Sequence, residues 1–164
     1  RKTMIIEKQN STIELLDDCV VKTLKNRKKS YEWYEAYKKF SHGKDSYVKI
    51  LEFEPTRLVM EKIKIWQPVN YYLKKLTHDR QLNLQIAKTY TTVILDCFNF
   101  DTNDRYKYWA HDDLTIDNFV ITKDKNIILM DPDSFHFTKY MIDYKYSFGY
   151  IELQNLITRN EYEK

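Results

Sequence analysis

The stretch His111-Asp112-Asp113-Leu114-Thr115-Ile116-Asp117-Asn118 decides how this sequence is interpreted, together with Met130-Asp131-Pro132-Asp133 a short distance downstream. Carboxylates and one amide are concentrated in these two segments. Aspartate and asparagine are common in ordinary turns, because both side chains bend and cap the backbone locally. The cluster carries chemistry only if its two segments meet in space, which depends on the residues between them.

Those intervening residues have the pattern of a β-hairpin. Two apolar runs, at residues 119–122 and 127–130, flank the polar loop 123–126. Two such runs joined by a four-residue loop are typical of a hairpin. Because a hairpin returns the chain to its starting point, we expect Asp131 to lie beside Asn118.

In this arrangement the two segments resemble the catalytic centre of the protein kinase-like superfamily. The catalytic loop of that superfamily reads H-x-D-L-x-x-x-N, and a magnesium-binding Asp follows it in a D-F-G motif. The resemblance implies that Asp113 orients the acceptor hydroxyl and takes its proton, while Asn118 and Asp131 hold Mg²⁺ against the phosphates of ATP. Asp133 is a further candidate metal ligand.

The resemblance extends upstream of the loop. Apolar periodicity predicts three strands, one helix and two more strands, at residues 4–8, 12–16, 19–24, 30–40, 47–53 and 57–61. This is the element order of a kinase N-terminal lobe, an antiparallel sheet of five strands with one helix. The resemblance therefore implies a single α+β, two-lobed domain, with an N-lobe at 1–62, a hinge at 63–69 and a reduced, mainly helical C-lobe at 70–164.

Several N-lobe residues match positions that contact the nucleotide in this superfamily. Val20-Val21-Lys22 resembles the V-A-x-K strand, whose Lys grips the phosphates and pairs with a helix Glu. Glu32 and Glu35 are both candidates for that partner, and we prefer Glu32 because it flanks the apolar stripe of the helix more closely. Ser11 and Thr12 offer hydroxyl groups to phosphate.

The strand at 57–61 resembles the last strand before the hinge. The resemblance implies that the backbone from Glu61 to Ile63 hydrogen-bonds adenine and that Met60 guards the pocket behind it. In the C-lobe, Pro68 suits the first turn of a short helix. Apolar residues at helical spacing predict two further helices, at about 79–98 and 143–159.

Three departures from the superfamily bear on function. No glycine stands in Gln9-Asn10-Ser11-Thr12, where the loop that covers the nucleotide is expected, so backbone approach to phosphate is harder. Asp112 replaces the Arg of H-R-D that reads a phosphorylated activation loop, and no A-P-E signature follows. Thr115 and Asp133 resemble small RIO-type kinases and aminoglycoside, choline or homoserine phosphotransferases better than Ser/Thr protein kinases.

Composition narrows the range of partners. The 164 residues are 43% hydrophobic, enough for a buried core, and the net charge of +3 is too small to favour nucleic acid or an anionic membrane. We find neither an apolar run of membrane length nor a signal peptide. Cys19 and Cys97 lie on apolar faces, which predicts buried thiols rather than a disulfide and hence a cytoplasmic protein. Abundant Lys, Asn, Ile and Tyr hint at an AT-rich, viral genome, and so at the host cytoplasm.

Together these features predict a kinase that uses ATP and Mg²⁺ to move the γ-phosphoryl group to a hydroxyl of a protein Ser/Thr or of a small molecule. A pseudokinase that serves as a nucleotide-regulated binding module is the alternative favoured by the missing glycines. A structural protein that retains the fold without ATP is a third hypothesis. A nucleic-acid binder built on residues 25–29 is less favoured, because that basic run suits a solvated turn before the helix.

Overall fold

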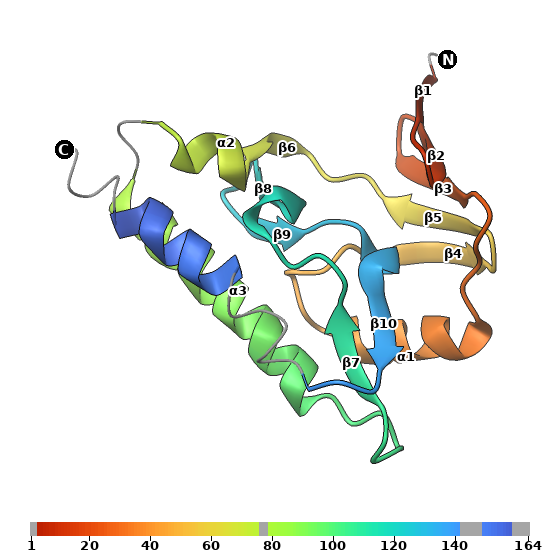
Figure 1. The fold of residues 1–164 in the computed structure, drawn as a ribbon. Coiled ribbons are helices and arrows are strands. Elements are labelled where there is room, and N and C mark those ends of the chain that lie inside the picture. Colours follow the sequence, from red (N-terminus) through yellow and green to blue (C-terminus); the bar gives the residue numbers. More distant parts are fainter. Residues whose placement is uncertain (1–2, 76–78, 142–148, 159–164) are drawn as a thin grey trace. The chain divides into compact units, whose positions relative to one another are not determined.

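The computed structural model describes residues 3–75, 79–141 and 149–158 (Figure 1). The chain divides into two units, Arg1–Ile63 (unit 1) and Lys64–Lys164 (unit 2). None of the helices in the described ranges has the length and apolar character needed to span a bilayer.

Unit 1 is built on the five-stranded antiparallel sheet that the sequence predicts. The strands lie in the order β1-β2-β3-β5-β4. Strands β3 and β5, which pair with each other near the middle of the sheet, carry most of its buried side chains. The bounds of the strands are β1 Met4–Glu7, β2 Ser11–Leu15, β3 Cys19–Leu24, β4 Ile50–Glu54 and β5 Arg57–Glu61.

The single helix of unit 1, α1 (Tyr31–Ser41), begins where a capping residue stops the preceding coil. The Ser30 hydroxyl accepts a hydrogen bond from the Trp33 backbone N–H at 3.0 Å. Trp33, Tyr37 and Phe40 are buried, and the Tyr34 ring stacks on Phe53 of β4 with centroids 4.6 Å apart. These contacts confirm that the tyrosine-rich helix packs on the sheet.

One predicted strand was too long at its start. Strand β4 begins at Ile50 rather than at residue 47. Tyr47 and Val48 are nevertheless buried, because they support α1: the Val48 carbonyl accepts a hydrogen bond from the Tyr37 hydroxyl at 2.5 Å, and the Tyr47 ring lies 4.7 Å from Phe40. Tyr47 and Val48 are therefore apolar because they are buried, and not because they belong to a strand.

Unit 2 combines helices with short strands. Its helices are α2 (Val69–Leu73), α3 (Arg80–Asn99) and a helix at residues 149–158, which runs beside α3 in Figure 1. One sheet has the order β6-β8-β9, and β7 pairs with β10. The bounds are β6 Ile65–Pro68, β7 Tyr108–His111, β8 Phe119–Thr122, β9 Ile127–Leu129 and β10 Phe135–Thr138.

The predicted helices and hairpin of unit 2 are confirmed within the described residues. Asp79 caps α3 by accepting from the Gln81 backbone N–H at 2.8 Å, and β8 pairs with β9 around the loop at 123–126. The predicted start of the last helix, at 143–148, lies outside the described residues. Of the two cysteines, Cys97 is buried as predicted, whereas Cys19 is partly exposed.

Strands β6, β7 and β10 are not among the strands that the sequence predicts. Each has only four residues, too few to establish a periodicity. Each also pairs with a strand distant in the sequence, β6 with β8 and β7 with β10. Such pairings depend on tertiary packing, which local pattern does not report.

Candidate active site

The loop between β7 and β8 is tied at both ends to the turn that contains Asp131. At its start, the Asp112 backbone N–H donates to the Ser134 carbonyl at 2.8 Å, next to the pairing of His111 with Phe135. At its end, the Met130 backbone N–H donates to the Asn118 carbonyl at 2.8 Å. The predicted hairpin therefore returns the chain as expected and sets the Asp131 turn against the loop.

Hydrogen bonds inside the loop fix Asp113 and Asn118 relative to one another. The Asn118 side-chain Nδ2 donates to the Asp113 carbonyl at 2.5 Å, and the Thr115 N–H donates to the same carbonyl at 3.0 Å. Since the first of these bonds uses the side-chain nitrogen of Asn118, its Oδ1 is the atom suited to bind a cation. The exposed Asp113 carboxylate is suited to meet a substrate.

His111 supports the loop as a neutral, buried ring. Its Nδ1 accepts a hydrogen bond from the Asp113 backbone N–H at 3.1 Å, and the residue is fully buried. Burial lowers the pKa of His111 to about 4, although nearby carboxylates, Asp131 foremost, act in the opposite direction. The ring is thus neutral at pH 7, which leaves Nδ1 able to accept.

Asp131 stands in a strained backbone conformation. Its φ of 60° and ψ of 68° lie in the left-handed region, directly before Pro132, where the helical regions are disfavoured. Such a conformation costs about 1–3 kcal/mol and is found most often at functional sites. Asp133, in the turn Pro132–Ser134, is buried, whereas Asp131 is partly exposed. Of the two, Asp131 is the more accessible to a ligand.

The donor set of this site fits Mg²⁺ held jointly with phosphate. The described residues contain no group of three His, Cys, Asp or Glu able to hold a metal ion by themselves. One amide oxygen and one carboxylate, from Asn118 and Asp131, form the kind of incomplete oxygen set that Mg²⁺ completes with water and phosphate oxygens.

A glycine and a tyrosine, which sequence reasoning did not connect with the loop, support it from behind. The Tyr90 hydroxyl of α3 donates to the Leu114 carbonyl at 2.6 Å, and burial raises the pKa of Tyr90. A Cβ added to Gly149 would lie 2.7 Å from the same carbonyl and still closer to the Tyr90 hydroxyl. The only available signal was that Gly149 is one of just two glycines in the chain.

We expect Gly149→Ala to destabilise the protein by about 1–3 kcal/mol, because the added methyl group has no room. In a helix without such contacts, Gly→Ala is instead stabilising by about 0.5–1 kcal/mol. Urea unfolding of the variant measures whether the free energy of unfolding falls or rises. Asn155→Ala, at an exposed position of the same helix, is the control, and a Gly149→Ala protein more stable than wild type would contradict the close packing.

In unit 1, Lys22 and Ser11 share one face of the sheet, and Thr12 lies on the other. Lys22 is 5% exposed and pairs with Ile13 of β2, so strand alternation places Ser11 on the same face. The Thr12 hydroxyl is bonded to Glu7 at 3.1 Å. The structure thus brings only one of the two predicted phosphate-binding hydroxyls to the face of Lys22.

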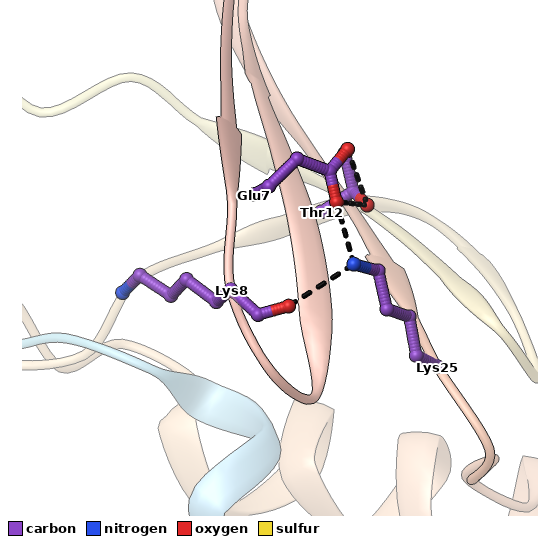
Figure 2. Close-up of polar contacts among 4 residues, drawn as sticks. All are labelled: Glu7, Lys8, Thr12 and Lys25. Carbon is purple, nitrogen blue, oxygen red and sulfur yellow. Dashed lines mark hydrogen bonds and ion pairs between the residues drawn. The ribbon is translucent and has the colours of Figure 1, made fainter.

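The glycine-free turn between β1 and β2 is braced by side chains (Figure 2). Lys25 Nζ donates to the Glu7 carboxylate at 2.5 Å and to the Lys8 carbonyl at 3.0 Å. The Lys25 backbone N–H also donates to the Asn10 carbonyl at 2.9 Å. Hydrogen bonds from Lys25 and then Thr12 lower the pKa of Glu7. Specific polar contacts from Lys25 therefore hold this turn, which contains no glycine.

The two glutamates of α1 lie in different surroundings. Glu35 Oε1 lies 3.2 Å from Lys38 Nζ on the same helix, while Glu32 stands in the first turn, and both are exposed. Glu32 as the partner of Lys22 stays a prediction.

Replacing Lys22 by Met should weaken ATP binding roughly tenfold, the loss expected when a hydrogen bond to a charged group is removed. If Glu32 orients Lys22, Glu32→Gln should reproduce much of the loss, and the double variant should lose less than the sum. The shift in melting temperature produced by ATP measures nucleotide binding in the two single variants and in the double variant. Glu35→Gln is the matched control. Strict additivity of the losses from Lys22→Met and Glu32→Gln, or a loss seen only in Glu35→Gln, would reject Glu32 as the partner of Lys22.

The end of unit 1 holds the residues predicted to bind adenine. Met60 is 8% exposed in β5. The Glu61 backbone N–H donates to the Lys49 carbonyl at 3.0 Å, and its carboxylate accepts from the Lys49 N–H at 3.0 Å. Since the Glu61 N–H is already bonded to Lys49, contacts with adenine would come from the other backbone groups between Glu61 and Ile63.

Comparison with known proteins bears on the fold. No protein-family model and no curated protein matches the sequence. Among solved structures, the streptomycin–ATP ternary complex of APH(2'')-IIa matches with a TM-score of 0.60 over 98% of this chain and 81% of the other. The fold is protein kinase-like. The predicted α+β class is confirmed, and at 11% identity the likeness extends to the fold alone.

Proposed function

We propose that this protein is a phosphotransferase that uses ATP and Mg²⁺ to phosphorylate a hydroxyl group. The observation that carries the proposal is the junction of two segments: the Asn118 carbonyl is bonded to Met130, and the Asn118 side chain is bonded to Asp113. A candidate base and two candidate metal ligands thus lie in two segments that hydrogen bonds join.

Each residue of these two segments that we assign to the site has a chemical task in the proposed reaction. Asp113 orients the acceptor hydroxyl and takes its proton on the carboxylate. Asn118 Oδ1 and Asp131 hold the metal–nucleotide complex, with Asp133 behind Asp131. Bound Mg²⁺ supplies neutralisation of the charge that develops on the phosphate oxygens. His111 keeps the Asp113 backbone in place from the core.

We assign nucleotide binding to residues of unit 1 and the segment that follows it. Lys22 would meet the phosphates, Ser11 would add a hydroxyl from the same face, and Met60 with the Glu61–Ile63 backbone would receive adenine. In this proposal residues 1–62 act as the N-lobe, 63–69 as the hinge and 70–164 as the C-lobe.

The acceptor class is a small molecule in our preferred version. APH(2'')-IIa, a structure similar to this chain, is described in complex with ATP and streptomycin. The departures at Asp112 and Thr115 also separate this chain from Ser/Thr protein kinases. A protein Ser/Thr hydroxyl is the second acceptor class.

The alternative is a pseudokinase, and the braced turn of Figure 2 favours it. Because Lys25 holds the turn with its side chain, the backbone there is less free to close on phosphate than a glycine loop. Such a protein would bind nucleotide and transfer nothing.

Two measurements on the whole chain test the proposal. The first is the melting shift with ATP, with and without Mg²⁺, and the second is transfer of labelled γ-phosphate to a panel of hydroxylated small molecules, to peptides and to water. The phosphotransferase should show both. A shift without transfer to any acceptor establishes the pseudokinase, and no shift with any nucleotide rejects both functions.

A further inference from the structure

The side chains of Asp112 and His136 are in contact at the start of the loop between β7 and β8. His136 Nε2 lies 2.6 Å from Asp112 Oδ1, and His136 Nδ1 lies 3.0 Å from the Phe137 carbonyl. Carboxylate and carbonyl oxygens only accept hydrogen bonds, so both ring nitrogens satisfy them only as donors. Both ring nitrogens of His136 thus face acceptor oxygens, and the contact of Nε2 is with a carboxylate.

The register of the β7–β10 ribbon explains why these two side chains meet. His136 pairs with Ala110 in the ribbon, and Asp112 is the first residue after β7, next to the pair formed by His111 and Phe135. The Asp112 N–H also donates to the Ser134 carbonyl. Asp112 is thus held by its backbone and by its side chain, one residue before Asp113.

We propose that His136 is a positioning residue, which holds Asp112 and thereby sets Asp113 for phosphoryl transfer without a phosphorylated loop. This proposal rests on the proposed function. In kinases with H-R-D, the loop carries a cation and the anion is a phosphate added later. In this chain the roles are exchanged: the loop carries the acidic side chain, Asp112, and β10 supplies the basic side chain, His136, as part of the same fold.

The contact should affect catalysis more than stability. The side chains are 26% and 62% exposed for His136 and Asp112, and ion pairs at such exposure contribute little to folding. A displacement of the neighbouring Asp113 should affect the reaction rate more than it affects folding stability. A shift of about 1 Å in a reacting group lowers rates by up to roughly a hundredfold.

Four variants test the proposal. His136→Gln and Asp112→Asn should each lower kcat by roughly tenfold to a hundredfold, with the KM for ATP and the Mg²⁺–ATP melting shift unchanged. Their combination should be no worse than either alone, because the two residues act as a unit. His136→Arg keeps a basic side chain that donates to Asp112 and should retain most of the kcat that His136→Gln loses. Thr138→Val, on the same face of β10, is the control and should behave as wild type.

Hydrogen exchange at residues 110–118 makes the result independent of any acceptor. His136→Gln should speed exchange of the loop amides, whereas Thr138→Val should not. If wild type transfers no phosphate, the proposed function fails, and exchange still decides whether His136 holds the loop. Unchanged kcat and unchanged exchange in His136→Gln would overturn the proposal, as would a wild-type enzyme whose activity is lost on phosphatase treatment.

Discussion

Replacing Asp113 by Asn is expected to lower phosphoryl transfer by roughly a hundredfold or more, the contribution of a positioned base. The backbone of Asp113 holds the loop, through its N–H to His111 and its carbonyl to Asn118. Asn has the same shape and leaves those bonds intact, so only the basicity of the exposed carboxylate is lost. Steady-state turnover and the Mg²⁺–ATP melting shift, measured on the same protein, separate catalysis from binding.

The melting shift of Asp113→Asn should equal that of wild type. Asp117→Asn, which changes an exposed carboxylate in the same loop, is the matched control for charge and should retain turnover. Full turnover in Asp113→Asn would mean that another group takes the proton. A lost melting shift would mean that Asp113 binds the metal–nucleotide complex instead.

Replacing Asp131 by Asn should abolish the part of the ATP melting shift that depends on Mg²⁺. A ligand that binds only the folded state stabilises it by RT ln(1 + [L]/Kd), so loss of the metal-binding carboxylate appears directly as a smaller shift. Asn tolerates the left-handed backbone conformation of Asp131, with its φ of 60°, so the turn should persist. Turnover should fall with the shift.

The control for this variant is Asp124→Asn, in the exposed loop of the β8–β9 hairpin. It removes the same charge and should leave both measurements unchanged. A full Mg²⁺-dependent shift in Asp131→Asn would show that this aspartate is not the metal ligand. A shift lost only in Asp133→Asn would transfer the role to the buried neighbour.

The sequence alone determined the elements that arise from local pattern. The five strands and α1 of unit 1, the long helix α3 and the β8–β9 hairpin each follow from apolar periodicity over several residues. The structure adds that Ser30 and Asp79 cap the starts of α1 and α3. The hairpin also made the meeting of Asn118 with the Asp131 turn predictable, since antiparallel pairing brings its two ends together.

Only the tertiary structure decided the contacts between segments distant in the chain. Strands β7 and β10 are too short for a periodic signal, and their pairing is what places His136 on Asp112. The contact of Gly149 with Tyr90 and Leu114 depends on the approach of the last helix to α3, which no local pattern encodes. Strand register likewise put Ser11 on the face of Lys22 and Thr12 on the other. Local pattern specifies elements because backbone geometry repeats over a few residues, whereas the site depends on which elements pack together.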